Sequence, residues 1–446
     1  MTNFTAEPGS LGKLSWDKGQ SGDGADIQRQ VWSVEVKGGQ APMVRHGSEQ
    51  VRAVRMVQDG RLGFAASRTK SWLELKQEAL RSCANGPETK LDEPVIGSTA
   101  GSNIKSRWTS AMIPQMNGAA LTLYHTLQNL SSDFRPSVTI SFVQVTTQLT
   151  TSNGGQAVWT QGYWDVSAGG RRVNGTDFHG IAETRLKADD IPDINQLGLD
   201  LAQRFGWGQD LQTIDSGKYP IVFLPPVTMG LLTSVLARLS GPSLISGNSP
   251  WEDQREQQVL SPLLSIFSDA TIPDGPRTSP FDDEGTSTGK WALIENGILK
   301  NFVLNRDAAR HLGLEPQGMG YRPAPTAMPL SLPANLVIQP SASSFSELLN
   351  RFPRMLVLNG WIGGRPTNPL RGDIAGNASD LYFSEQGVIT GRVKNAVISV
   401  NVFDALSHQL VDVGQDASWV AQGMMQAAPG KLPPLLIDHV DVTVRQ

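Results

Sequence analysis

Residues 281–295 read Phe-Asp-Asp-Glu-Gly-Thr-Ser-Thr-Gly-Lys-Trp-Ala-Leu-Ile-Glu, and residues 296–313 continue Asn-Gly-Ile-Leu-Lys-Asn-Phe-Val-Leu-Asn-Arg-Asp-Ala-Ala-Arg-His-Leu-Gly. The stretch begins with three acidic residues and a glycine, a combination that builds a tight turn. The Asn-Gly pair that follows lies between two apolar runs, which predicts a β-hairpin. The last residues, Ala-Arg-His-Leu-Gly, have the form of a helix end. We therefore expect a turn, a hairpin and a short helix in this order.

The acidic turn supplies the candidate site residues, Asp282, Asp283, Glu284 and Gly285. Adjacent carboxylates can hold a hard cation or act as an acid–base pair. Consecutive residues point in different directions, however, and the alternating Asp/Asn spacing of a calcium loop is missing. A solvated turn or a hydrogen-bonded structural corner is therefore the favoured interpretation. An enzyme with an unrecognised site, built from these carboxylates or a single histidine, is an alternative.

Outside this stretch the chain is long enough for two domains. It has 446 residues, and a single hydrophobic core stops growing at about 250–300 residues. Asp215-Ser216-Gly217 separates a helical pattern from an apolar run, and we place the domain boundary there. The expected fold class is α+β, with residues 1–25 as a flexible lead-in, 26–215 as an N-terminal α/β domain and 216–446 as a C-terminal, mainly antiparallel β domain.

Local patterns predict several helices and strands. Ser71 and Glu74 form a capping-box pattern at the start of a helix, and Cys83, the only cysteine, falls on its apolar stripe as a core residue. Ser344 and Glu347 repeat the capping pattern. Further predictions are strands over 31–36, 51–57, 138–149 and 436–444, helices over 193–204 and 227–239, and a hairpin at 153–155.

Composition excludes several function classes. The formal net charge is −4, from 38 basic and 42 acidic residues, so we expect neither a nucleic-acid surface nor a polybasic membrane patch. The longest apolar stretch, 219–239, is broken by three prolines and predicts a buried strand and helix rather than a membrane span. The N-terminus lacks the apolar segment of a secretory signal, so a cytoplasmic location is the expectation.

The six histidines do not form a metal-binding pattern. The closest pair, His408 and His439, is 31 positions apart, whereas two zinc ligands on a helix must lie about one turn apart. We expect the histidines to have separate surface or core positions. Residue chemistry alone therefore predicts a soluble two-domain protein without a visible active site.

The order and spacing of several sequence blocks strongly resemble the TldD/PmbA metalloprotease family. The central block is residues 281–313, with its acidic turn, its Leu-Ile-Glu-Asn-Gly-x-Leu-Lys hairpin and its Ala-Arg-x-Leu-Gly helix end. Further blocks are 59–64, 216–220, 259–268, 372–376 and 385–388. The resemblance extends from about Val31 to Val444 and implies the two-domain fold of that family.

The family has two branches that form a heterodimer in known cases. TldD-type chains look like the catalytic half, with His-Glu-x-x-x-His on a helix and a cysteine that hold zinc, whereas TldE (PmbA) chains lack that motif. The equivalent helix here is about 229–239, and no His, Glu or Cys occurs between Lys218 and Pro250. Leu and Val offer zinc no lone pair. The chain therefore resembles the TldE branch, and we expect no cofactor in it.

The resemblance implies a non-catalytic subunit that is inactive alone. A TldD-like partner would supply zinc, and the pair would cleave unfolded proteins or mature peptides. This chain would complete a closed chamber and help to hold an extended peptide substrate by strand addition to a sheet edge. A stand-alone homodimeric peptide-binding protein without catalysis is the alternative from another class.

Overall fold

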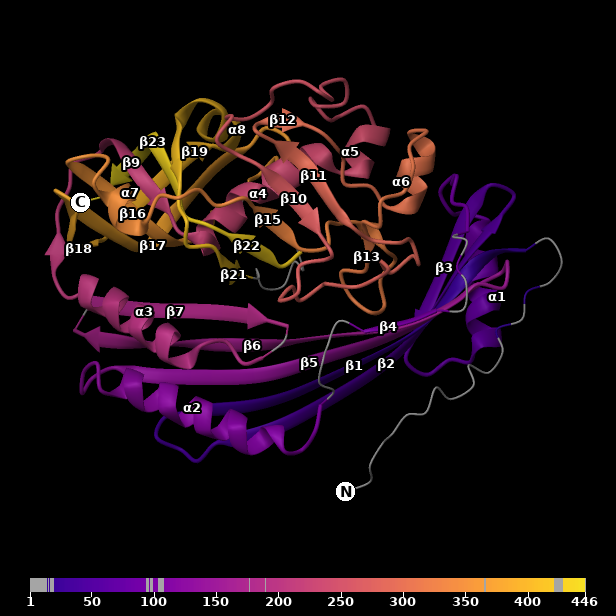
Figure 1. Ribbon diagram of the computed structural model, residues 1–446, viewed down its shortest axis with the longest axis horizontal. Coiled ribbons are helices and arrows are strands. Elements are labelled where there is room, and N and C mark those ends of the chain that lie inside the picture. Colours follow the sequence, from indigo (N-terminus) through magenta and orange to yellow (C-terminus); the bar gives the residue numbers. More distant parts are fainter. Residues whose placement is uncertain are drawn as a thin grey trace.

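A computed structural model describes residues 14, 16, 20–93, 96, 99–102, 108–175, 177–188, 190–364, 366–420 and 428–445. In this part of the chain, an N-terminal unit of long strands lies against a C-terminal unit built from further sheets (Figure 1). No helix in these ranges is long and apolar enough to cross a membrane.

The N-terminal unit is a seven-stranded sheet in the order β3-β2-β1-β5-β6, with β4 and β7 both paired to β6. All pairings are antiparallel except that of β4 with β6. The strands are β1 (Ser21–Lys37), β2 (Met43–Gln58), β3 (Arg61–Ser67), β4 (Thr99–Ser102), β5 (Arg135–Thr151), β6 (Gln156–Asn174) and β7 (Asp177–Lys187).

The start of β1 corrects the expected lead-in. Residues 21–25 belong to the sheet, and Gly22 to Ile27 are buried. The polar residues here are not a flexible tail, because Asp23 forms a buried ion pair with Arg55 on β2. Residues 1–13 of the expected lead-in lie outside the described residues.

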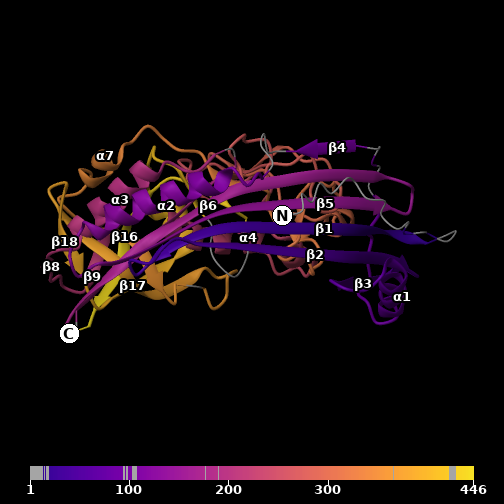
Figure 2. The ribbon, with the colours of Figure 1, turned by 90° about the horizontal axis from the view of Figure 1, so that it is seen from below.

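Three helices cover the N-terminal sheet at its two ends. The predicted helix is confirmed as α1 (Trp72–Cys83), with the capping box of Ser71 and Glu74 and with Cys83 buried. It packs on β2 and β3, while α2 (Met112–Gln128) and α3 (Ile194–Trp207) lie side by side over the other end of the long strands (Figure 2). The sequence patterns did not predict α2.

Side-chain alternation gives the long strands two different faces. Trp32, Val34 and Val36 of β1 pack with α2 and α3 in one hydrophobic cluster. On the opposite face, Ala25 and Ile27 of the same strand pack with Phe281 of the C-terminal unit. The C-terminal unit therefore lies on the face that the helices leave open.

The C-terminal unit contains an eight-stranded sheet in which β16 pairs with both β9 and β17. The order β16-β9-β23-β19-β17 thus closes into a ring. Because β8 already pairs with β18, the chain enters this sheet shortly before the boundary expected at Ser216. The strands are β8 (Leu211–Gln212), β9 (Gly217–Phe223), β16 (Arg354–Ile362), β17 (Asp373–Glu385), β18 (Val388–Val393), β19 (Ala396–Asn401), β20 (Leu410–Val413) and β23 (Leu435–Val444).

A second sheet and the helix α4 (Pro225–Leu239) share one large core with this ring. The second sheet contains β12 (Ile298–Leu299), β11 (Lys290–Glu295), β10 (Ile266–Asp269), β15 (Leu336–Ile338), β22 (Gly430–Leu432) and β21 (Ser418–Val420). The remaining elements are β13 (Gly320–Tyr321), β14 (Leu330–Ser331), α5 (Gly241–Ile245), α6 (Arg306–His311), α7 (Phe345–Leu349), α8 (Val402–Asp404) and a π-helical turn, Ala405–Gln409.

Candidate functional site

The acidic turn lies where the C-terminal unit meets the long sheet. Asp282 accepts hydrogen bonds from the backbone N–H groups of Glu284, Thr286 and Gly320, at 3.0, 2.9 and 2.9 Å. Gly285 has a φ of +76°, a conformation that glycine adopts without strain. The turn is therefore fixed by its own side chain and by the start of β13.

Glu284 connects this turn to both units. Its Oε1 accepts a hydrogen bond of 2.5 Å from Arg55 on β2, and its Oε2 accepts one of 2.6 Å from the backbone N–H of Arg306 at the start of α6. A Cβ at Gly320 would lie 2.1 Å from Oε2, so only glycine fits beside this carboxylate. The Arg306 guanidinium in turn donates to the backbone oxygens of Asp92 and Glu93 in the N-terminal unit.

Arg55 is the centre of a buried ion cluster. It donates two hydrogen bonds to Asp23 Oδ2, at 2.9 and 2.5 Å, besides the one to Glu284. The three side chains expose 4% or less of their surface. Burial by itself would lower the pKa of Arg55, but Asp23 and Glu284 outweigh it and raise that pKa. Arg55 therefore stays charged inside the junction.

Asp282 and Asp283 are each held by backbone N–H donors. Burial, followed by the charge of Glu284, raises the pKa of Asp282 well above its usual value. Burial also raises the pKa of Asp283, whose Oδ2 accepts a 2.7 Å hydrogen bond from the backbone N–H of Arg322. Of the four turn residues, Glu284 is thus the one that bonds to the N-terminal unit, and both oxygens of Asp282 and of Glu284 already have donors.

The sequence did not identify Asp23, Arg55, Arg306 and Arg322 as members of this cluster. Asp23 and Arg55 are only two of several charged residues in β1 and β2, so their charge alone gave no signal. The two are direct partners in the register of β1 and β2. Glu284 lies 229 positions from Arg55, so its role required the structure.

Helix α4 does not fit a zinc ion. Its residues 227–232 are buried, and the side chains there are Val, Thr, Met, Gly, Leu and Leu. The Thr228 hydroxyl donates to the backbone oxygen of Phe223. None of these groups is a usual zinc ligand. Among the described residues, no group of three or more His, Cys, Asp or Glu side chains is placed to hold a metal ion.

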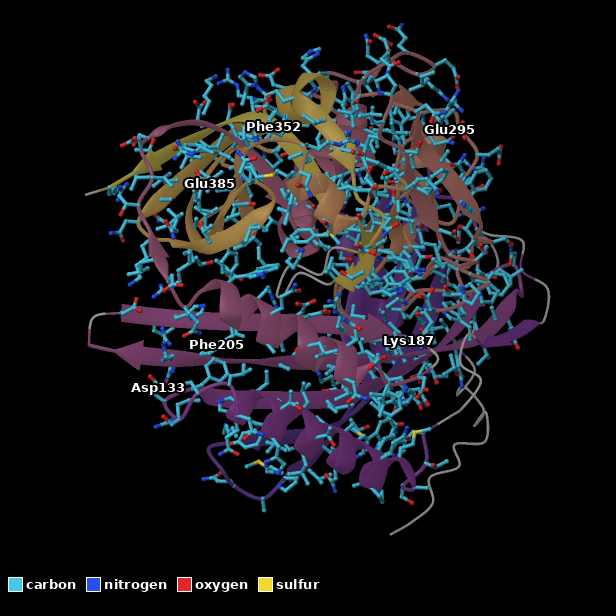
Figure 3. The ribbon with its side chains drawn as sticks, turned by 60° about the vertical axis from the view of Figure 1, so that its left-hand side comes forward. Asp133, Lys187, Phe205, Glu295, Phe352 and Glu385 are labelled. Atoms are coloured by element: carbon cyan, nitrogen blue, oxygen red, sulfur yellow. The ribbon has the colours of Figure 1, made fainter. Side chains whose placement is uncertain are left out.

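The histidines occupy separate positions. His46, His125, His408 and His439 are exposed, and His311 is half-buried. His179 on β7 is buried and stacks on Phe205 of α3, which Figure 3 labels, with ring centroids 5.4 Å apart. Burial, with a contribution from Arg392, lowers the pKa of His179 to about 4. His179 is therefore neutral at pH 7.

The sheet has an open edge along the first half of β2. Arg52 to Gln58 pair with β3, but Met43 to Val51 pair only with β1 within the described part of the chain. This half of β2 forms the border of the sheet in Figure 2. Its residues 43–48 are all exposed. The edge therefore offers backbone donors and acceptors to an added strand.

A hollow of about 390 Å³ lies beside this edge, on the face of β1 and β2 opposite the helices. A Cβ at Gly47 would have nothing within 4 Å. The hollow is a depression open to solvent rather than an enclosed cavity. Its lining residues are Arg29, Val31, Ser33, Gly47, Ser48 and Glu49.

Comparisons with known proteins agree with this architecture. Over 95% of the chain, the fold is similar to the crystal structure of TldE from Thermococcus kodakarensis, with a TM-score of 0.80, 19% identity and 96% of that chain covered. An uncharacterized protein of Methanocaldococcus jannaschii is 23% identical over 83% of this chain and 86% of its own length.

A metalloprotease of Methanothermobacter thermautotrophicus is 32% identical over 45% of this chain and 44% of its own length. The alignment thus spans less than half of that relative. Residues 216–444, more than half of the chain, match the family described as the PmbA/TldA metallopeptidase C-terminal domain. With this match and the ring, helix α4 and acidic turn that it contains, the chain belongs to the PmbA/TldD metallopeptidase family.

Proposed function

We propose that this chain is the non-catalytic, TldE-like subunit of a cytoplasmic two-subunit zinc metallopeptidase. The observation that carries the proposal is helix α4, which lies in the core of a metallopeptidase-family unit but presents no zinc ligand. The similarity of the fold to a protein titled TldE supports the same assignment.

The catalytic metal would belong to a TldD-like partner of the same family. Zinc there would activate a water molecule for peptide hydrolysis. This chain would complete the enclosure around the substrate. Unfolded proteins or peptide precursors are the proposed substrates, because a peptide that binds through its backbone must be extended.

The open edge of β2 is the surface that we assign to the peptide. Residues 43–51 have one side without a strand partner in the described part of the chain, and they span about 25–30 Å at the usual rise per residue. Backbone pairing gives affinity with little side-chain selection. The edge carries Arg45 and Glu49, which form ion pairs with Glu35 and Arg68.

The test is to purify this chain, a TldD-like chain and their mixture. We expect a stable complex, and zinc-dependent cleavage of an unfolded substrate such as casein only when the TldD-like chain is present. Zinc-dependent cleavage by this chain alone would refute the proposal. A stable homodimer that ignores the partner would instead favour the stand-alone peptide-binding protein.

A further inference from the structure

A row of ring side chains crosses the N-terminal sheet and ends at the open edge of β2. In the strand register, His46 of β2 pairs with Trp32 of β1, and Trp32 pairs with Phe142 of β5. Phe142 pairs in turn with Trp164 of β6. Because residues directly opposite one another lie on the same face of a sheet, the four rings form one row. The row lies on the face against which α2 packs.

The rings of this row are in contact with one another. The rings of His46 and Trp32 are stacked, with centroids 5.0 Å apart and planes 15° apart. Trp32 also stacks with Trp108, at 4.4 Å. The Phe142 centroid lies 6.2 Å from that of Trp32 and 4.9 Å from that of Trp164. Pairs of rings at such distances stabilise a structure beyond the area that they bury.

The row becomes more exposed towards the edge. Phe142 exposes 2% of its surface, Trp32 is half-buried and His46 is exposed. Beyond His46, no strand of the described residues pairs with β2 at this level. One more strand would cover the open side of His46 and extend the row by one position.

The neighbouring rows on the same face are not aromatic. Val44 pairs with Val34, and Val44 exposes 47% of its surface whereas Val34 exposes 0%. On the other side of His46, Ser48 pairs with Gln30, which makes a polar row. A strand added to this edge would therefore meet a ring on this face at one position, opposite His46.

Side chains bond the backbone of the other edge strands of this sheet. On β7, the backbone oxygen of Phe178 accepts a hydrogen bond from Arg392. On β3, the backbone N–H of Phe64 donates to Ser82 Oγ of α1. Such covering protects an edge from further strands. The first half of β2, which pairs only with β1 within the described residues, is thus the edge to which a strand can add.

We propose that the peptide strand that adds to the β2 edge carries an aromatic residue opposite His46, and that His46 and Trp32 select this residue. A residue directly opposite on the added strand has its Cβ about 4.5–5.5 Å from that of His46, which brings its ring within stacking distance. The inference rests on the proposed peptide-holding function. It adds a preference for extended segments that contain Phe, Tyr or Trp.

The test measures the binding of three peptides to the full chain by fluorescence anisotropy. Each peptide has four Thr residues on both sides of a central Phe, Leu or Ala, an N-terminal dye and a C-terminal amide. The symmetric sequence presents the same pattern in either strand direction. We expect the Phe peptide to bind about two- to tenfold more tightly than the Leu peptide, the range for an aromatic pair beyond its buried area. The Ala peptide shows what burial of an apolar side chain contributes.

Three variants locate the preference. His46→Thr keeps a strand-forming residue but removes the ring, so the Phe and Leu peptides should then bind equally. His46→Phe keeps a ring and should retain the preference for Phe. Arg45→Thr is the matched control, because Arg45 is the next residue of β2, is also exposed and has its side chain on the other face. It should leave the preference unchanged.

Equal binding of the Phe and Leu peptides to the native chain, or a preference that survives His46→Thr, would overturn the inference and leave the peptide-holding function standing. A preference that Arg45→Thr also abolishes would overturn the assignment to His46. If none of the three peptides binds, both the inference and the peptide-holding function are wrong. Sedimentation velocity adds one outcome: a dimer that dissociates on His46→Thr would assign the edge to a second copy of the chain and overturn the inference.

Discussion

Replacing Arg55 by methionine tests whether the buried ion cluster holds the two units together. Arg55→Met keeps an unbranched side chain but removes the guanidinium group. Asp23 and Glu284, exposed by only 4% and 0%, would then lose the ion-pair partner that the described residues give them. Glu284 would keep the backbone N–H of Arg306 as a donor, which does not neutralise its charge.

The expected loss follows from the burial of all three groups. Removing one partner of a buried ion pair lowers the free energy of unfolding by about 3–5 kcal/mol, because the remaining charge is left without compensation. We expect Arg55→Met to lose this amount at pH 7. Lys70→Met breaks an ion pair with Glu78 in which both side chains are at least one-third exposed, and it should cost less than about 1 kcal/mol.

The pH dependence distinguishes charge from packing. In Arg55→Met, the two buried carboxylates would take up protons more readily than they do in the unfolded chain. The folded state of the variant then gains stability as the pH falls, so its deficit should be smaller at pH 5 than at pH 7. Adding Asp23→Asn and Glu284→Gln to Arg55→Met should recover stability at pH 7, because no unpaired charge remains.

The assay is urea unfolding at pH 7 and pH 5, followed by circular dichroism and tryptophan fluorescence. Comparing the two signals shows whether the units unfold together. A loss below about 1 kcal/mol at pH 7, or an equal loss at both pH values, would refute the assignment of the cluster as an electrostatic lock.

Three further predictions concern single positions. Gly320→Ala should lower the free energy of unfolding by about 2 kcal/mol or more, because its Cβ would meet Glu284 Oε2 at 2.1 Å; urea unfolding checks this, and an unchanged midpoint would contradict it. The pKa of His179 is about 4 in the folded chain, against 6.5 for an ordinary histidine. As the pH falls from 6.5 towards 4, this histidine therefore takes up a proton in the unfolded chain but not in the folded one, and the free energy of unfolding decreases. His179→Phe should remove roughly 1–3 kcal/mol of that loss, seen as a flatter plot of melting temperature against pH, and a plot that keeps the native slope would contradict this. Ser71→Ala should cost about 1 kcal/mol by removing the cap of α1, and an unaltered urea midpoint would count against that role.

Elements whose causes are local could be predicted from the sequence. The capping boxes at Ser71 and Ser344 form as expected, because each needs only residues three positions apart. Asn296 and Gly297 both have positive φ between β11 and β12, as the hairpin prediction requires. The fold class was also predicted, because sequence blocks that lie mostly in such local elements resemble those of one protein family.

Features that depend on distant residues could not be predicted. The Asp-Gly-rich start of β1 has the composition of a flexible tail, and its burial depends on strand pairing with β2 and β5 and on the ion pair of Asp23 with Arg55. Helix α2 was missed because Pro114 and Gly118 interrupt its pattern; the helix gains its stability from packing on β1 and β5. The open edge of β2 is likewise a property of the sheet, since it depends on where β3 begins.

The candidate sites differ in which of their polar atoms are still available to bind a ligand. In the acidic turn, Asp282 and Glu284 use both oxygens within the protein, so this family signature stabilises the junction and has little capacity left for chemistry. Helix α4 is apolar where a metal site would need donors. The edge of β2, in contrast, has backbone donors and acceptors with which no strand of the described residues pairs. Because an added strand can pair with such exposed backbone groups in place of water, this edge is the part of the described chain that best suits an extended peptide.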